Sequence, residues 1–209
     1  MKNKGKPVLL LGCGIFKREF APLPESLRDG FHPIFLDSML HMEPARLDLL
    51  LKNALEKTGD DPVVLAFGDC SPHLTEFDNH AHTVRVAGCN CCEIWLGKQR
   101  YGELRKEAAF FLMLEWALRW EHIIKDELGL ETKELAKDFM AQTLRRAVYI
   151  DTGVIPVPTE TLEAFSVYTG LPVTVEKVGY AHFAASLESA LHRIAGKSSS
   201  GGSPGMVSS

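Results

Sequence analysis

The sequence predicts an α/β protein with a doubly wound, mostly parallel sheet and helices on both faces, a Rossmann-like arrangement. Two observations support this fold class. Short, continuous apolar runs, typical of strands buried on both faces, alternate with amphipathic segments of helical length. Several of these runs end at a glycine, where the chain can turn sharply toward a helix. Such alternation of strands and helices is typical of parallel sheets.

The first half of the chain contains four apolar runs that we expect to be strands, at residues 7–11, 32–37, 62–67 and 83–87. The clearest helix between them covers residues 43–57, which have a proline in the first turn and leucines along one face. Residues 17–29 are also expected to be helical, although Pro22 and Pro24 interrupt them.

In the second half of the chain, the sequence pattern predicts more helix than strand. A helix is expected to open at residues 91–96, and an aromatic-rich apolar pattern predicts one long helix over residues 104–127. Further segments are expected as helices at residues 132–146, 160–168 and 182–194, and as strands at residues 147–151 and 173–175. We expect residues 1–196 to form a single domain and residues 197–209, rich in Ser and Gly, to be a disordered tail.

Composition excludes several classes of function. The 209 residues suit one domain, and the formal net charge of −4 without a basic run argues against nucleic acid as a partner. No apolar stretch approaches the ~20 residues of a membrane helix, so neither a membrane partner nor a spanning segment is expected. The odd number of cysteines, five, favours free thiols over a secreted disulfide framework. We therefore expect a cytoplasmic protein, and the formation of a homo-oligomer stays open.

Cysteines follow three of the expected strands. Cys13, Cys70 and Cys89 each come within three residues of a strand end, and Cys91 extends the group. Because the carboxyl ends of parallel strands lie along one edge of a sheet, these thiols are expected to gather there. His41, which follows the second strand, is expected to face the same edge.

Thiols and imidazoles in such a cluster are the ligands of zinc and of iron–sulfur centres. We expect Cys13, Cys70 and Cys91 to bind a metal, with His41 or Cys89 in the fourth place. Zinc is the first choice and an iron–sulfur cluster the second. Three glycines beside these thiols would let the backbone approach a bound cofactor closely, namely Gly12, Gly14 and Gly68.

Other interpretations of the same residues remain open. Free cysteines often only fill space, and Cys92, expected to face away from Cys91, is predicted to pack. The segment Gly12-Cys13-Gly14 lacks the third glycine of a dinucleotide-binding fingerprint. Among the loop histidines, His73 is the most interesting because it lies close to Cys70 in the sequence.

These motifs, in this order, resemble the domain of unknown function 1638 family of bacteria and archaea. The resemblance covers about the first half of the chain and rests on Gly12-Cys13-Gly14, Leu40-His41 with Pro44, Gly68-Asp69-Cys70, and Asn90-Cys91 leading to Leu96-Gly97. The chain departs from the family pattern at three positions. Asn90 stands where Asp is expected, Cys89 where His is commoner, and Ser71 where Gly is usual, so the resemblance leaves a different ligand set open.

The resemblance implies a protein that works alongside corrinoid-dependent methyl-transfer systems. Its partner would be a corrinoid, a corrinoid protein or a small molecule. One hypothesis is an enzyme, or an accessory of one, in one-carbon metabolism. A second is a metal- or cluster-binding carrier or sensor without turnover. A third is a protein whose cysteines only pack. A substrate-sized pocket beside the metal favours the first hypothesis, a closed four-ligand site the second, and thiols that do not converge the third.

Overall fold

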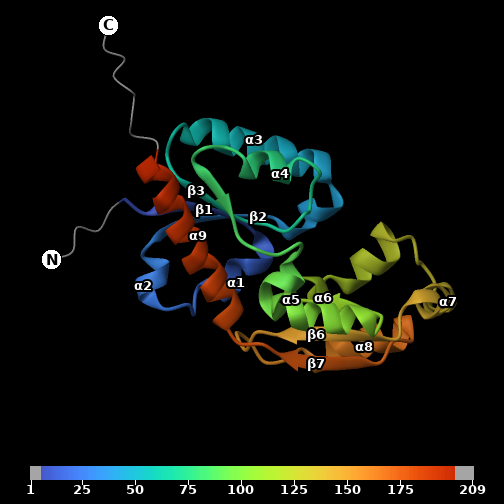
Figure 1. Ribbon diagram of the computed structural model, residues 1–209. Coiled ribbons are helices and arrows are strands. Elements are labelled where there is room, and N and C mark those ends of the chain that lie inside the picture. The colour runs from blue at the N-terminus through green and yellow to red at the C-terminus, as the bar shows by residue number, and fades with distance from the viewer. Residues whose placement is uncertain (1–5, 201–209) are drawn as a thin grey trace, which may run out of the picture. The chain divides into compact units, whose positions relative to one another are not determined.

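A computed structural model describes residues 6–200, except for the side chains of residues 78 and 198–200. The chain divides into two compact units, the first within Met1–Ala87 and Ala184–Ser209 and the second at Gly88–Phe183. Each unit has a parallel sheet of its own with helices packed on it, which confirms the α/β, Rossmann-like fold class (Figure 1). The assignment of residues 1–196 to a single domain stays a prediction.

The sheet of the first unit contains the four strands expected from the apolar runs. They are β1 (Val8–Cys13), β2 (Phe31–Leu36), β3 (Val63–Ala66) and β4 (Thr83–Arg85). All neighbours are parallel, and the spatial order is β2-β1-β3-β4. The chain thus adds β2 on one side of β1 and then returns to add β3 on the other. The point between β1 and β3 where the order reverses is the switch point of a doubly wound sheet.

Helices cover both faces of this sheet, as expected. Figure 1 shows α3 and α4 on one face and α1, α2 and α9 on the other. Leu47 and Leu51 of α3 pack on Leu11 and Leu65 of the sheet in one buried cluster. The helical elements are η1 (Gly14–Phe16), α1 (Lys17–Phe20), α2 (Glu25–Arg28), η2 (Ser38–Met42), α3 (Pro44–Thr58), α4 (Leu74–Asp78) and α9 (Ala181–Ser200). Two short helices, α1 and α2, replace a continuous one because prolines stand between them.

The last helix runs farther than the composition predicts. The helix α9 continues through residues 197–200, which we expected to belong to the tail. Lys197 donates a hydrogen bond to the carbonyl oxygen of Thr83 at 2.8 Å, which ties this end of α9 to β4. The rest of the expected tail, residues 201–209, lies outside the described residues. Although α9 has 20 residues, neither it nor any other described helix combines the length and apolar character needed to cross a membrane.

The second unit has a sheet of three parallel strands in the order β5-β6-β7. The strands are β5 (Ala109–Leu112), β6 (Arg146–Asp151) and β7 (Val173–Lys177). Its helices are α5 (Cys91–Lys106), α6 (Leu114–Leu118), the π-helix η3 (His122–Glu127), α7 (Lys133–Thr143) and α8 (Thr159–Thr169). One buried cluster joins β5 and β6 to the helices, with Trp120, Met140 and Phe165 among its members.

The expected long helix over residues 104–127 is wrong. The helix α5 ends at Lys106, Ala108 takes a positive φ of 55°, and the chain enters the strand β5. Phe110 and Phe111 are aromatic residues that suit a strand, and they pair with Ala147 and Val148 of β6. An apolar segment of this kind fits a buried helix as well as a strand, and its pairing with a distant strand decides between them.

Candidate functional site

The carboxyl ends of β1 and β3 carry two of the expected thiols. Cys13 is the last residue of β1, and Cys70 lies in the segment that follows β3. Residue Gly12 of β1 pairs with Ala66 of β3, so these strand ends are neighbours at the switch point. Both thiols are partly buried and pack against the same apolar cluster as Leu11. The sheet therefore brings Cys13 and Cys70 to the position where ligands of doubly wound folds bind.

His41 lies beyond the end of the neighbouring strand. The last residue of β2, Leu36, pairs with Cys13. Asp37 comes next and caps η2 by accepting a hydrogen bond from the N–H of Met39 at 2.9 Å. The imidazole of His41 is exposed on one side, but the protein atoms on its other side desolvate it and lower its pKa below 6.5. The neutral form that this favours is the form that binds metals.

Close packing explains the glycines around Cys13. A Cβ atom at Gly14 would lie 2.7 Å from the carbonyl oxygen of Leu36, and one at Gly12 would lie 3.0 Å from the Phe35 ring. The end of β2 therefore requires small residues at both positions. The cofactor-binding role that we expect for Gly12, Gly14 and Gly68 stays a prediction.

The remaining thiols lie at the start of the second unit. Cys89 is exposed, and its thiol donates a hydrogen bond to Oε2 of Glu93 at 2.7 Å. Between them, Asn90 caps α5 by accepting a hydrogen bond from the N–H of Glu93 at 2.9 Å. The Asn90 side chain also donates to the hydroxyl of Tyr101. Cys89 is thus held at the first turn of α5 by a carboxylate and a capping amide.

The thiols of Cys91 and Cys92 lie together. Their Sγ atoms are 4.0 Å apart, so the expectation that Cys92 faces away from Cys91 is wrong. A hydrogen bond with Cys92, followed by burial, raises the pKa of the Cys91 thiol well above 9.0. A metal that binds here must displace the proton of Cys91, which makes its affinity depend on pH.

The expected ligand set is distributed over both units. Cys13, His41 and Cys70 belong to the first unit, and Cys89 and Cys91 to the second. Among the side chains that the structure describes, no group of three or more Cys, His, Asp or Glu residues is arranged to hold a metal ion. That Cys13, Cys70 and Cys91 bind one metal, with His41 or Cys89 in the fourth place, therefore stays a prediction.

A set of polar contacts that the sequence did not reveal lies next to Cys70. Asp48 of α3 accepts hydrogen bonds from the Ser71 hydroxyl and, at 2.6 Å, from Nδ1 of His73. The sequence singles out His73 but not its partner, because Asp48 and Glu56 are both acidic residues of α3 and no local pattern distinguishes them. The contact depends on how α3 packs beside the segment after β3.

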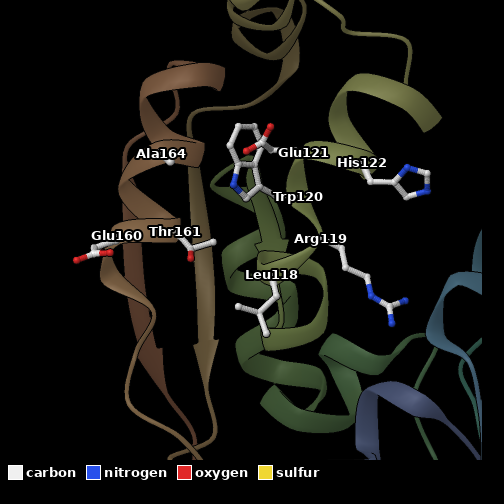
Figure 2. A pocket seen from close by; sticks show the side chains of 8 residues that line it. All are labelled: Leu118, Arg119, Trp120, Glu121, His122, Glu160, Thr161 and Ala164. Carbon is white, nitrogen blue, oxygen red and sulfur yellow. The ribbon is translucent and has the colours of Figure 1, made fainter.

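The second unit contains a cavity of about 610 Å³ between α8 and the segment that joins α6 to η3. Figure 2 shows the indole of Trp120 between the two segments, with Arg119 and His122 directed to one side and Glu160 to the other. Leu118, Glu121, Thr161 and Ala164 complete the lining. None of these lining residues is a cysteine, so the cavity offers no thiol ligand.

The fold and the site together define an α/β protein with thiols and a histidine at the carboxyl ends of parallel strands. Residues 35–187 match the family model described as "Protein of unknown function (DUF1638)", and the chain belongs to this family. The match includes His41, Cys70, Cys89 and Cys91, whereas the Gly12-Cys13-Gly14 segment precedes it. Searches of curated proteins and of solved structures found no match to the chain.

Proposed function

We propose that this protein binds a soft metal ion through thiolates at its strand ends and acts in or beside corrinoid-dependent methyl transfer. The observation that supports metal binding most is the placement of Cys13 and Cys70. They flank the switch point between β1 and β3, with His41 after the adjacent strand β2. Three donor side chains thus follow three adjacent strands of one sheet.

The chemistry of these donors fits zinc first. Thiolate sulfur and imidazole nitrogen are its preferred ligands, and iron–sulfur clusters are bound by thiolates too. In the second unit, the 4.0 Å between the Sγ atoms of Cys91 and Cys92 is close to what one zinc ion requires. Two Zn–S bonds of ~2.3 Å at a tetrahedral angle place their sulfurs about 3.8 Å apart. Cys92 thereby joins Cys91 as a candidate ligand.

The metal would supply Lewis acidity or hold a thiolate in its reactive form. The Cys13 and Cys70 thiols and the His41 imidazole would hold it in the first unit, and Cys91 with Cys92 in the second. The link to methyl transfer rests on the family resemblance, which implies a corrinoid protein or a small molecule as partner. A carrier or sensor that binds the same metal without turnover is the alternative.

Elemental analysis of anaerobically purified full-length chain, compared with its variants, tests the proposal. We expect Cys13→Ser and Cys70→Ser to lose the metal held in the first unit, so that each contains less metal than wild type, and to keep the wild-type circular dichroism spectrum. His192→Ala, which removes an exposed imidazole of α9, is the control and should keep its metal. Wild-type metal content in both cysteine variants would rule out a site at the switch point.

A methyl-transfer assay separates the two alternatives. The metal-loaded chain would be incubated with methylcobalamin and a thiol acceptor, and loss of the cobalt–methyl absorbance would be followed. Accelerated loss that depends on Cys70 supports the enzyme, whereas bound metal without any acceleration supports the carrier or sensor.

A further inference from the structure

A cavity of about 710 Å³ lies in the first unit between α3 and the segment that contains α4. Asp48, on the first half of α3, and His73, just before α4, both line it. No cysteine is among the residues that line the cavity.

The two residues form a histidine–carboxylate pair with a defined geometry. Nδ1 of His73 lies 2.6 Å from Oδ2 of Asp48, while the other carboxylate oxygen accepts from the Ser71 hydroxyl. The side chain of Asp48 is only 18% exposed, whereas that of His73 is 53% exposed. A partly buried carboxylate thus fixes the ring through Nδ1, which leaves Nε2 as the nitrogen that can meet a ligand. A carboxylate that orients an imidazole in this way also stabilises the imidazolium ion.

Ser71 is a support for this pair. In a catalytic triad the serine hydroxyl bonds to the imidazole, and the imidazole bonds to the carboxylate. Here the Ser71 hydroxyl donates to Asp48 instead, and its oxygen accepts from the backbone N–H of His73 at 3.2 Å. Ser71 therefore positions both partners, and an attack on a substrate would come from water.

The cavity wall indicates which molecules fit. Leu49, Leu55 and Phe77 supply apolar surface that suits a small hydrocarbon group. The charged and titratable groups beside the pair are Lys52, Glu56 and Asp60 from α3 and the turn after it, and Glu76 and His80 from the α4 side. Together with Asp48, carboxylates outnumber the one lysine, which disfavours anionic ligands.

We propose that His73, held by Asp48, is the general base of a hydrolytic site that takes small uncharged carboxylic esters. Nε2 of His73 accepts a proton from water while the water oxygen bonds to the ester carbonyl carbon. The carbonyl π electrons, which this attack moves onto the carbonyl oxygen, re-form the C=O bond as the carbon–oxygen bond to the leaving alcohol breaks, and the electron pair of the broken bond stays on the leaving oxygen. The proton passes from the imidazolium to the leaving oxygen or to solvent, which restores the base and gives an acid and an alcohol.

The Asp48 contact has a second consequence that can be measured. Its hydrogen bond, followed by its charge, raises the pKa of His73 above 6.5. Since the neutral ring is the base, the rate should rise with pH through this raised pKa. Without the carboxylate the midpoint should move to lower pH.

Steady-state hydrolysis of 4-nitrophenyl acetate by the full chain, followed from pH 5 to 9 after any initial burst, is the test. General-base catalysis raises a reaction rate about 10²–10⁴-fold. We therefore expect His73→Ala to lower the protein-catalysed rate of hydrolysis at least tenfold. Asp48→Asn should slow the reaction and lower the midpoint of its pH profile. His192→Ala, remote in sequence and exposed, is the matched control and should leave the rate unchanged.

Two results would overturn the proposal. One is a rate in His73→Ala equal to that in His192→Ala, and the other is a stable acetyl group on Ser71 in mass spectra, which would make serine the nucleophile. An NMR titration of the His73 ring in wild type and Asp48→Asn checks the contact independently of turnover. Repeating the assay with a chelator separates this site from the proposed metal, because the His73-dependent rate should persist.

Discussion

Gly14 follows β1 and lies close to the backbone at the end of β2. A Cβ atom there would lie 2.7 Å from the Leu36 carbonyl oxygen, which is backbone and cannot rotate away. The position of Cys13 therefore depends on a glycine beside it. The sequence predicts that Gly14 lies in a turn, but the contact that requires it becomes visible only when β1 and β2 are paired.

Gly14→Ala should destabilise the protein because the new methyl group must push β1 and β2 apart. Overpacking of this kind typically costs about 1–3 kcal/mol, measured as the free energy of unfolding in urea. Gly102→Ala is the matched control, because a Cβ atom at this α5 position meets no atom within 4 Å. An alanine there should stabilise the helix by roughly 0.5–1 kcal/mol. Equal stabilities of the two variants would contradict the packing argument.

Individual elements differ in how far the sequence predicts them. The strands β1 to β4 are predicted because each is a short apolar run next to a turn. The strand β5 is not predicted from the sequence, because Phe110 and Phe111 lie inside an apolar segment with helical spacing. Their partners are Ala147 and Val148 of β6, and no local pattern reveals that pairing. Tertiary pairing overrides local periodicity at this point.

The N-terminus of α7 offers a test at the scale of an element. The Thr132 hydroxyl accepts a hydrogen bond from the N–H of Leu135 at 3.2 Å and so caps this helix. Thr132→Ala should lower the free energy of unfolding by about 1 kcal/mol, the usual effect of losing a cap. Thr143→Ala at the other end of α7 should have little effect, and metal content should stay unchanged in both variants. A stability loss at Thr143 as large as that at Thr132 would argue against the cap.

The helix α5 and the strand β7 are joined by an ion pair that predicts a pH dependence. Arg100 donates to both carboxylate oxygens of Glu176, at 2.8 and 2.9 Å, and thereby lowers the pKa of Glu176 below 4.5. A carboxylate whose pKa is lower in the folded state stabilises the fold above its unfolded pKa and loses this contribution as the pH falls.

Arg100→Gln should therefore be less stable than wild type at pH 7, and the difference in the free energy of unfolding should shrink below about pH 4.5. Urea denaturation at a series of pH values measures this, with Lys98→Gln as the control. A difference that stays constant with pH would contradict the assignment.

At the scale of the whole molecule, the order of the strands determines where the candidate ligands lie. The sequence predicts that cysteines follow strands, and the strand order β2-β1-β3-β4 places two of them at a switch point. It could not predict that the thiols of Cys91 and Cys92 lie 4.0 Å apart, because side-chain rotamers decide that distance. Nor could it predict the Asp48–His73 contact, which joins residues on separate elements.

Binding of cobalt(II) to the reduced, metal-free chain tests the central claim most directly. Cobalt replaces zinc in tetrahedral sites, and thiolate ligation gives it charge-transfer and visible absorption bands. We predict that both sets of bands appear, saturate at a fixed number of ions per chain, and disappear when zinc is added. Under the same anaerobic conditions, a titration without thiolate bands, together with no iron or zinc in the protein as purified, would contradict the account.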